Sequence, residues 1–248
     1  MVPQELKAAS QKVALVTGAG RGIGRAIAVA LAQGGYALCL AARTLAELEE
    51  TRRLSDLDPS RALIVLVDLA DAEAPANLCD AALSHFGRLD VLVNNAGWAP
   101  PRTSLIKLRP EDLERMIAVN LRAPIALARL AAIQMTKQAG GGVIVNIASV
   151  AARNQAAGET VYAAVKAGLI AFTRSCFAEF RQSDVRTAVI IPGLTDTAFI
   201  PQNKRLDRAA MLRPEDVAGA VLGVVNAAGG TAPLEIVLEP ARDPLRAG

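Results

Sequence analysis

The chain has 248 residues, of which 52% are hydrophobic, 21% charged and only 3% aromatic. This composition excludes a disordered protein and supplies a sizeable core for a single domain, which we expect to span residues 1–248. The formal net charge of +3 is spread without a basic block and the opening residues are polar, so neither nucleic acid nor a membrane is an expected partner. Three scattered cysteines fit reduced thiols in a cytoplasmic protein, and a single histidine argues against His-based metal sites and Ser-His-Asp hydrolysis.

Short apolar, β-branched runs alternate with longer helical stretches along the chain. The predicted strands cover residues 13–17, 37–41, 63–67, 91–94, 143–148, 187–191 and 235–238. The predicted helices cover residues 22–33, 45–54, 74–86, 110–138, 161–182 and 214–226. Nearly continuous apolar strands indicate burial on both faces, as in a parallel sheet between helices. The sequence therefore predicts an α/β, doubly wound Rossmann fold, with a seven-stranded parallel sheet and helices on both faces.

A glycine-rich loop, residues 18–24, joins the first strand to an Ala-rich helix. Glycines permit a tight turn that brings backbone N–H groups close to a pyrophosphate at the positive end of a helix. The spacing is G-x-x-x-G-x-G, not the commoner G-x-G-x-x-G. Its position predicts dinucleotide binding by Gly18, Gly22, Ile23 and Gly24.

The end of the second predicted strand indicates which dinucleotide is bound. An NAD site usually has an acid here that accepts a hydrogen bond from the ribose 2′-hydroxyl, but this chain has Ala42 followed by Arg43. A second cation, Arg21, lies in the glycine loop. Two arginines suit a 2′-phosphate, so the sequence predicts NADP(H) in preference to NAD(H).

The candidate catalytic residues follow the fifth predicted strand. Tyr162 and Lys166 are four residues apart and so share one face of a helix. Ser149 follows the strand itself, at the edge where open α/β sheets bind ligands. Residues 94–97 and 192–193 end two other strands at the same edge.

These motifs together resemble the short-chain dehydrogenase/reductase family, in a branch of NADP-preferring oxidoreductases of this chain length. The resemblance covers residues 12–238 and rests on the glycine loop, Asp68, residues 94–97, Asn120, Ser149, Tyr162, Lys166, and Pro192-Gly193 with Thr197. It implies a catalytic tetrad of Asn120, Ser149, Tyr162 and Lys166.

The resemblance also implies the cofactor contacts. Asp68 and Leu69 would border the adenine, and Asn94, Ala96 and Gly97 would flank the adenosine ribose. The carboxamide would be held by Thr197 and by the backbone from Gly193 to Thr195, which follows Pro192. Lys166 would hold the hydroxyls of the nicotinamide ribose, beside Tyr162.

In the chemistry expected of this tetrad, Tyr162 exchanges a proton with the substrate oxygen. A free tyrosine titrates near pH 10, and we expect Lys166 to favour the phenolate and bring that pKa toward the working pH. Ser149 would stabilise developing negative charge on the same oxygen. By resemblance, Asn120 would anchor a water in a proton relay to Lys166.

The favoured function is an NADP(H)-dependent carbonyl reductase or alcohol dehydrogenase acting on a small-molecule carbonyl or alcohol. A 3-oxoacyl-[acyl-carrier-protein] reductase is the alternative enzyme; it requires a basic mouth, for which Arg102, Arg153, Lys204 and Arg205 are candidates. A non-catalytic dinucleotide-sensing protein is the alternative from another class. By resemblance, helices 110–138 and 161–182 would form the interfaces of a homodimer or homotetramer.

The expected substrate pocket has a mixed lining. Candidates are Trp98, Val150, Ala151, Gln155, Glu159, Leu194 and residues 197–208. Residues 197–213, which should cover the substrate, look short, and residues 234–240 depart from the glycine-rich ending common in the family. We interpret His85 as a surface residue without a chemical role.

Overall fold

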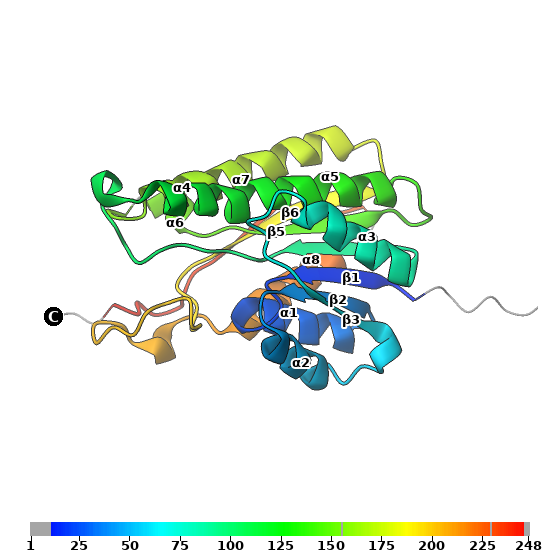
Figure 1. Cartoon of the computed structure of the whole chain (residues 1–248), viewed down its shortest axis with the longest axis horizontal. Coiled ribbons are helices and arrows are strands. Elements are labelled where there is room, and N and C mark those ends of the chain that lie inside the picture. The colour runs from blue at the N-terminus through cyan, green and yellow to red at the C-terminus, as the bar shows by residue number, and fades with distance from the viewer. Residues whose placement is uncertain (1–10, 155, 229, 246–248) are drawn as a thin grey trace, which may run out of the picture.

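The computed structural model describes residues 11–154, 156–228 and 230–245, which form an α/β fold around one parallel sheet (Figure 1). Within these residues the sheet has seven strands, as predicted, and their order is β3-β2-β1-β4-β5-β6-β7. The strands are β1 (Val13–Thr17), β2 (Ala37–Ala42), β3 (Ala62–Leu66), β4 (Val91–Asn94), β5 (Gly142–Ile147), β6 (Val185–Pro192) and β7 (Glu235–Leu238). All six pairings between neighbouring strands are parallel.

Helices cover both faces of the sheet. They are α1 (Gly22–Gln33), α2 (Leu45–Leu54), α3 (Ala74–Phe86), α4 (Pro110–Ile117), α5 (Ala123–Met135), α6 (Ala151–Asn154), α7 (Thr160–Phe180) and α8 (Pro214–Val225). Helices α1, α2 and α8 lie on one face and α3, α5 and α7 on the other (Figure 1). The predicted doubly wound architecture is thereby confirmed.

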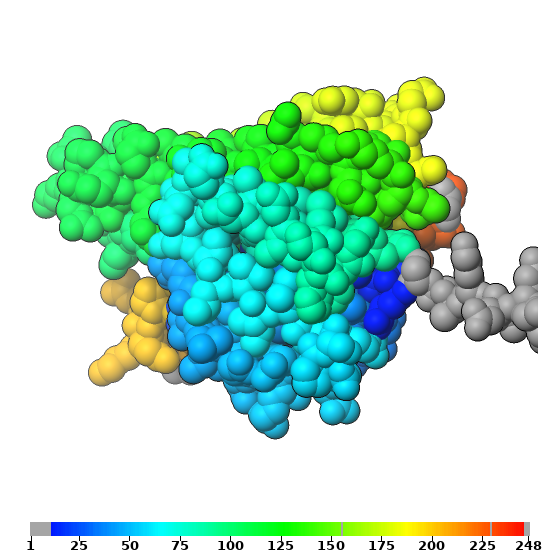
Figure 2. All heavy atoms as spheres, turned by 45° about the vertical axis from the view of Figure 1, so that its right-hand side comes forward, coloured from blue at the N-terminus to red at the C-terminus, as the bar shows by residue number. Residues whose placement is uncertain are grey.

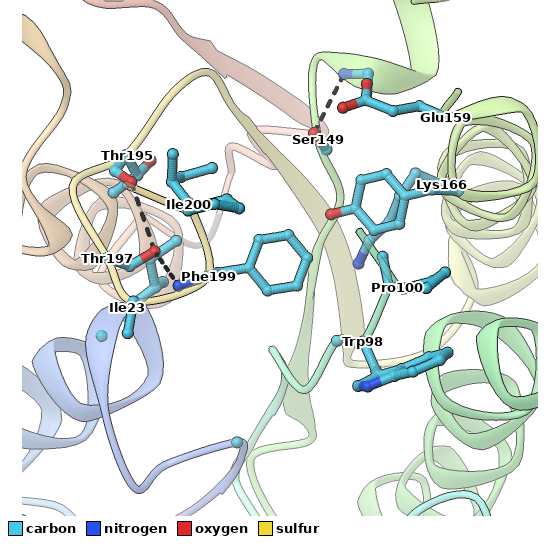
Figure 3. Close-up of a pocket in the computed structure, with 18 of the residues that line it drawn as sticks. Ile23, Trp98, Pro100, Ser149, Glu159, Lys166, Thr195, Thr197, Phe199 and Ile200 are labelled. Atoms are coloured by element: carbon cyan, nitrogen blue, oxygen red, sulfur yellow. Dashed lines mark hydrogen bonds between the residues drawn. The ribbon is translucent and has the colours of Figure 1, made fainter. Parts of the chain in front are cut away.

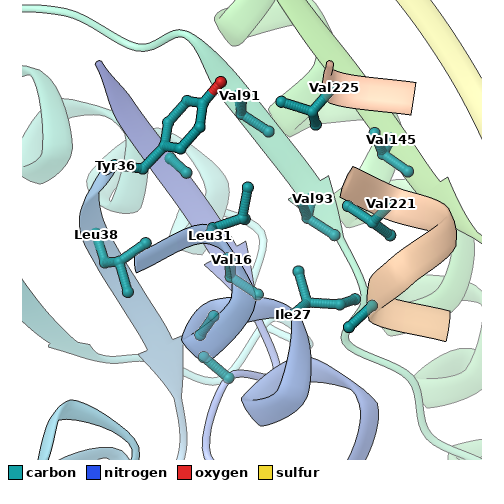
Figure 4. Packing of buried hydrophobic residues seen from close by; sticks show 14 of the residues in the cluster. Val16, Ile27, Leu31, Tyr36, Leu38, Val91, Val93, Val145, Val221 and Val225 are labelled. Atoms are coloured by element: carbon teal, nitrogen blue, oxygen red, sulfur yellow. The ribbon is translucent and has the colours of Figure 1, made fainter. Parts of the chain in front are cut away.

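Successive side chains along a strand point to opposite faces of the sheet and so join two different hydrophobic clusters. In β1, Ala14 and Val16 belong to the cluster that contains α1 and α8, and Leu15 belongs to the opposite cluster. Figure 4 shows Ile27 of α1 and Val221 of α8 packing together over the central strands. Strands buried on both faces are apolar throughout, and their positions can therefore be predicted from the sequence.

The helix predicted over residues 110–138 is interrupted. Between α4 and α5, residues Ala118–Arg122 form a π-helical turn in which the Ala123 N–H bonds the Ala118 carbonyl. Pro124 has no N–H, so the α-helical bond from residue 124 to the Asn120 carbonyl cannot form. Widened turns of this kind are frequent at functional sites, and this one carries Asn120.

Two helical stretches, Pro110–Met135 and Thr160–Phe180, are long and apolar enough to cross a membrane by length and composition alone. In the fold, 56% and 33% of their respective apolar windows are buried. Core helices pass the same test, and α5 packs on the sheet in the cluster that includes α3. Their composition is thus accounted for in part by packing within the chain.

The topology brings the predicted functional segments together. Strand β1 pairs with β2 on one side and with β4 on the other, so the chain order reverses beside β1. Open α/β sheets bind ligands at such a switch point, beyond the carboxyl ends of the strands.

Candidate functional site

A cavity of about 1410 Å³ lies at the carboxyl edge of the sheet. Its lining comes from the glycine loop, from the residues that follow β2 to β6, from part of α4 and from the start of α7. Residues 194, 195 and 197–206 complete the lining. We call residues 197–208 the lid. In Figure 2 the green region of α4 and the golden region of the lid project from the same end of the molecule, with a gap between them.

The glycine loop has the geometry that a bound pyrophosphate requires. Gly18 and Gly22 adopt positive φ angles of 64° and 53°, which side chains disfavour. A Cβ on Gly24 would overlap the Gly18 carbonyl, so α1 can begin this close to β1 only with glycine there. Helix α2 braces the loop, because Thr51 Oγ1 donates a hydrogen bond to the Ala19 carbonyl at 2.8 Å. The loop therefore needs glycine at these positions and lines the cavity, and dinucleotide binding by it stays a prediction.

The two arginines expected near the 2′-phosphate both line the cavity, together with Ala42. The structure adds an acid between α2 and the glycine loop. Glu47 Oε1 lies 3.7 Å from Arg21 Nη1, and the two side chains are 34% and 61% exposed. A Cβ on Gly20 would lie 2.9 Å from the Glu47 Cβ, so glycine is also needed here for α2 to approach. Glu47 is thus positioned to compete with the 2′-phosphate for Arg21, which the sequence analysis assigns to that phosphate.

Asp68, expected near the adenine, is part of an ion pair across the cavity. Arg115 Nη2 of α4 donates to Asp68 Oδ2 at 2.7 Å, and its guanidinium lies 5.4 Å from the centroid of the Trp98 ring. Burial works to raise the pKa of Asp68, but a bond from the Ala70 N–H and the charges of Arg115 and Arg43 outweigh it and lower the pKa. The Asp68 carboxylate is therefore held in its charged form.

The structure brings Ser149, Tyr162 and Lys166 together on the cavity wall (Figure 3). Tyr162 and Lys166 share one face of α7, with Lys166 Nζ 5.8 Å from the centroid of the Tyr162 ring. Nζ donates to the carbonyl of Ile147, the last residue of β5, at 2.9 Å. This bond ties α7 to the strand after which Ser149 lies.

Burial moves the pKa values of the two titratable residues in opposite directions, since it disfavours the charged form of each. It raises the pKa of Tyr162 to about 12; a hydrogen bond with Ser149 lowers it and nearby Glu159 raises it. It lowers the pKa of Lys166 to about 8. The expectation that Lys166 brings the Tyr162 pKa toward neutrality is not met in this structure, because burial has the largest effect on that pKa and only the hydrogen bond with Ser149 lowers it.

Asn120 is fully buried behind the cavity wall. Its Nδ2 donates to the carbonyls of Trp98 and Met116 at 2.6 and 3.0 Å, and its Oδ1 accepts from the Trp98 N–H at 3.3 Å. A Cβ on Gly97 would lie 3.1 Å from Asn120 Oδ1 and 3.8 Å from Lys166 Nζ. The side chain therefore holds the Gly97–Trp98 backbone next to Lys166.

Most of the other predicted cofactor contacts also line the cavity. These are Ile23, Leu69, Ala96, Gly97, Pro192, Gly193, Thr195 and Thr197. Asn94 is the exception: its side chain is 2% exposed and donates to the Pro124 carbonyl and to Asn146 Oδ1. Asn95 lines the cavity instead, with its Nδ2 donating to the Thr17 carbonyl at 2.9 Å.

The structure also locates the residues predicted for the substrate pocket and His85. The cavity is lined by Trp98, Val150, Ala151, Glu159 and Leu194. Gln155 lies outside the described residues. His85 is exposed, packs edge-on against Phe86 and does not line the cavity.

Sequence reasoning missed Glu47, Arg115 and Leu245 as lining residues, and Phe199 was included only as part of the lid. The first three lie in segments without a motif and reach the cavity through tertiary contacts. The Phe199 ring centroid lies 6.0 Å from that of Tyr162, and the two rings are tilted by 35°.

Comparison with known proteins gives consistent matches. A model of the family described as short chain dehydrogenase matches residues 12–207, from the glycine loop into the lid. The cis-4-hydroxycyclohexanecarboxylate dehydrogenase of Sinomonas cyclohexanicum is 37% identical over 224 residues, covering 87% of this chain and 89% of that enzyme.

Two solved structures extend the comparison to the fold. A metagenomic short-chain oxidoreductase in complex with NADP is 33% identical, with a TM-score of 0.80 over 93% of this chain and 98% of that one. The 3-ketoacyl-(acyl-carrier-protein) reductase of Brucella melitensis, complexed with NADH, is 27% identical, with a TM-score of 0.84 over 93% and 98%.

Proposed function

The chain belongs to the short chain dehydrogenase family, whose model matches residues 12–207, and we propose that it is an NADP(H)-dependent oxidoreductase that interconverts a carbonyl and an alcohol. The observation that carries this proposal is the meeting of Ser149, Tyr162 and Lys166 on the wall of the cavity that the glycine loop also lines. A protein that only sensed the dinucleotide could use Lys166 to hold a ribose but would not need the Tyr162 hydroxyl beside Ser149.

The residues of the chain have separable roles in the proposed reaction. When bound, the nicotinamide donates or accepts the hydride. The Tyr162 hydroxyl donates a proton to the carbonyl oxygen during reduction, and Ser149 donates a hydrogen bond to that oxygen. Lys166 provides positive charge beside the tyrosine that loses its proton. Asn120 positions the Gly97–Trp98 backbone next to the lysine.

Reduction is the direction that the isolated site favours at neutral pH. A tyrosine whose pKa is raised to about 12 is protonated at pH 7 and is ready to act as an acid. Alcohol oxidation requires the same residue to act as a base, which neutral pH disfavours.

NADP(H) is the proposed cofactor. Ala42 supplies no acid for a ribose 2′-hydroxyl, and the cavity is lined by Arg43, just after β2, and by Arg21 of the glycine loop. The solved relatives include an NADP complex and an NADH complex, so the family alone does not decide the preference. Glu47, which faces Arg21, reduces the positive charge available for phosphate, and we expect Arg43 to carry most of the discrimination.

A small-molecule substrate suits this site better than an acyl carrier protein. Two of the four cations considered for a basic mouth are paired with acids: Arg102 with Glu159 at 2.7 Å, and Arg153 with Glu235 at 2.9 Å. A docking surface for an acidic protein requires unpaired positive charge. We therefore favour a carbonyl reductase or alcohol dehydrogenase over a 3-oxoacyl-[acyl-carrier-protein] reductase.

We further propose that the enzyme is a cytoplasmic homo-oligomer. The apolar helical stretch Pro110–Met135 leaves Ile117, Ile125 and Ile133 between 36% and 40% exposed. An apolar stripe of this kind is covered in a dimer or tetramer. Light scattering coupled to size-exclusion chromatography would distinguish these states from a monomer.

The experiment that tests the function measures NADPH oxidation at 340 nm against ketones, aldehydes, diketones, quinones and 3-oxoacyl thioesters. We expect turnover of carbonyls by the wild-type enzyme and a loss of about 10²-fold or more in Tyr162→Phe, because the proton donor is removed. Tyr36→Phe is the matched control, since Tyr36 lies in the core and not at the cavity. Retention of more than about a tenth of the activity by Tyr162→Phe would refute the assigned role.

A further inference from the structure

The C-terminal tail, residues 240–245, is attached to the lid. The Asp207 N–H donates to the Pro244 carbonyl at 2.8 Å, and Leu206 forms an antiparallel bridge with Leu245. The Leu245 N–H donates to Asp243 Oδ1 at 2.8 Å, which fixes the turn that brings the tail to the lid. In Figure 1 the red trace of the tail accordingly lies beside the golden lid.

The lid and the tail present apolar side chains to the cavity. Leu245 is 60% exposed and Phe199 is 47% exposed, and both line the cavity together with Leu206. Large apolar side chains left exposed together around a hollow mark a place where a ligand buries them. Because the Phe199 ring centroid lies 6.0 Å from that of Tyr162, this apolar surface begins beside that tyrosine and continues outward to the tail.

We propose that the tail is the outer wall of the substrate pocket and that Leu245, with Phe199 and Leu206, binds an apolar arm of the substrate. The arm extends away from the reacting carbon, as the alkyl chain of a ketone or secondary alcohol does. This inference rests on the proposed function, because Tyr162 defines where the reacting carbon lies. The family model ends at residue 207, so the tail is a part of this chain that the shared family pattern does not describe.

Binding of ketones in the absence of cofactor tests the proposal without turnover. The chain has a single tryptophan, Trp98, which lines the cavity, so its fluorescence reports occupancy. We would titrate the enzyme with 2-pentanone and 2-nonanone in the absence of cofactor. Leu245→Ala should raise the Kd of 2-nonanone by about fivefold and that of 2-pentanone by less than about twofold, because only the longer chain reaches the tail.

Two further variants separate contact from folding. Leu54→Ala is the matched control: this leucine is 42% exposed on α2, does not line the cavity, and should leave both Kd values unchanged. A chain ending at Asp243 should lose affinity for 2-nonanone at least as strongly as Leu245→Ala. An equal loss for both ketones in the two tail variants, or no loss for either, would overturn the proposal.

Turnover of the same ketones separates this proposal from the proposed function. We expect the ratio of kcat/KM for 2-nonanone to that for 2-pentanone to fall about fivefold in Leu245→Ala. Turnover with an unchanged ratio overturns the role of the tail alone. Leu245-dependent binding without reduction of any carbonyl overturns the proposed reaction.

Discussion

Lys166 should make the folded enzyme less stable than it would be with an apolar residue in its place. The side chain is 3% exposed, and Nζ donates to the Ile147 carbonyl at 2.9 Å. Burial lowers the pKa of Lys166 from 10.5 to about 8, because the charged ammonium is poorly solvated there. We therefore expect Lys166→Met to abolish activity and to stabilise the fold at neutral pH.

The pKa sets the magnitude and the pH window. One pKa unit corresponds to about 1.36 kcal/mol, so lowering the pKa from 10.5 to about 8 corresponds to about 3 kcal/mol. Below pH 8 the lysine is charged in both the folded and unfolded states, and the full cost of burying the charge is present. Between pH 8 and 10.5 the unfolded chain binds more protons, so the wild-type free energy of unfolding rises with pH.

Urea unfolding of both proteins, at one protein concentration and at several pH values, measures this effect. The variant loses the bond to Ile147, so we expect a gain of about 2 kcal/mol at pH 7. The difference between the two unfolding free energies should change by about 3 kcal/mol from pH 7.5 to pH 10.5, in favour of the wild type. Lys137→Met, at an exposed lysine, should show no such change. A difference that does not vary with pH would refute the reasoning.

Three other predictions concern the cofactor and the direction of reaction. Arg43→Ala should lower the preference for NADPH over NADH by about tenfold or more in kcat/KM, because a hydrogen bond to a charged group contributes about 1.5–3 kcal/mol. Glu47→Gln should raise the same preference by roughly two- to fivefold, because it frees Arg21 from an exposed ion pair; a lower preference would contradict the inferred competition. Alcohol oxidation should accelerate as the pH rises above neutrality while carbonyl reduction does not, because the Tyr162 pKa is raised to about 12; an oxidation rate that falls with pH would argue against Tyr162 as the base.

The positions of strands and helices can be predicted from the sequence where a single local pattern determines them. Helix α1 follows the glycine loop directly, and helices α4 and α8 begin at Pro110 and Pro214, the first helical positions to which proline is suited. The π-helical turn was missed because periodicity does not distinguish a widened turn from an α-helix. Its signal is Pro124, which removes one helical donor within an otherwise regular pattern.

Side-chain direction and electrostatic environment were harder to predict. Asn94 and Asn95 are adjacent, and only the folded register shows that Asn94 faces the core opposite Asn146 while Asn95 faces the cavity. The pairing of Arg21 with Glu47 joins a loop to a helix 26 positions later, a contact that no local pattern encodes. The Tyr162 pKa depends on burial by the surrounding wall, which spacing along one helix does not reveal.

The opposite shifts of Tyr162 and Lys166 have one origin and suit one direction of proton transfer. Burial keeps Tyr162 neutral, and it brings the pKa of Lys166 to about 8, where proton exchange with solvent is easiest near the working pH. In the proposed reaction, Lys166 lies beside the tyrosine that gives up its proton during reduction, with Nζ 5.8 Å from the centroid of the ring. Because burial keeps the Tyr162 pKa at about 12, the residue is protonated at neutral pH. We therefore expect the site to favour proton donation to a carbonyl over removal of a proton from an alcohol at neutral pH.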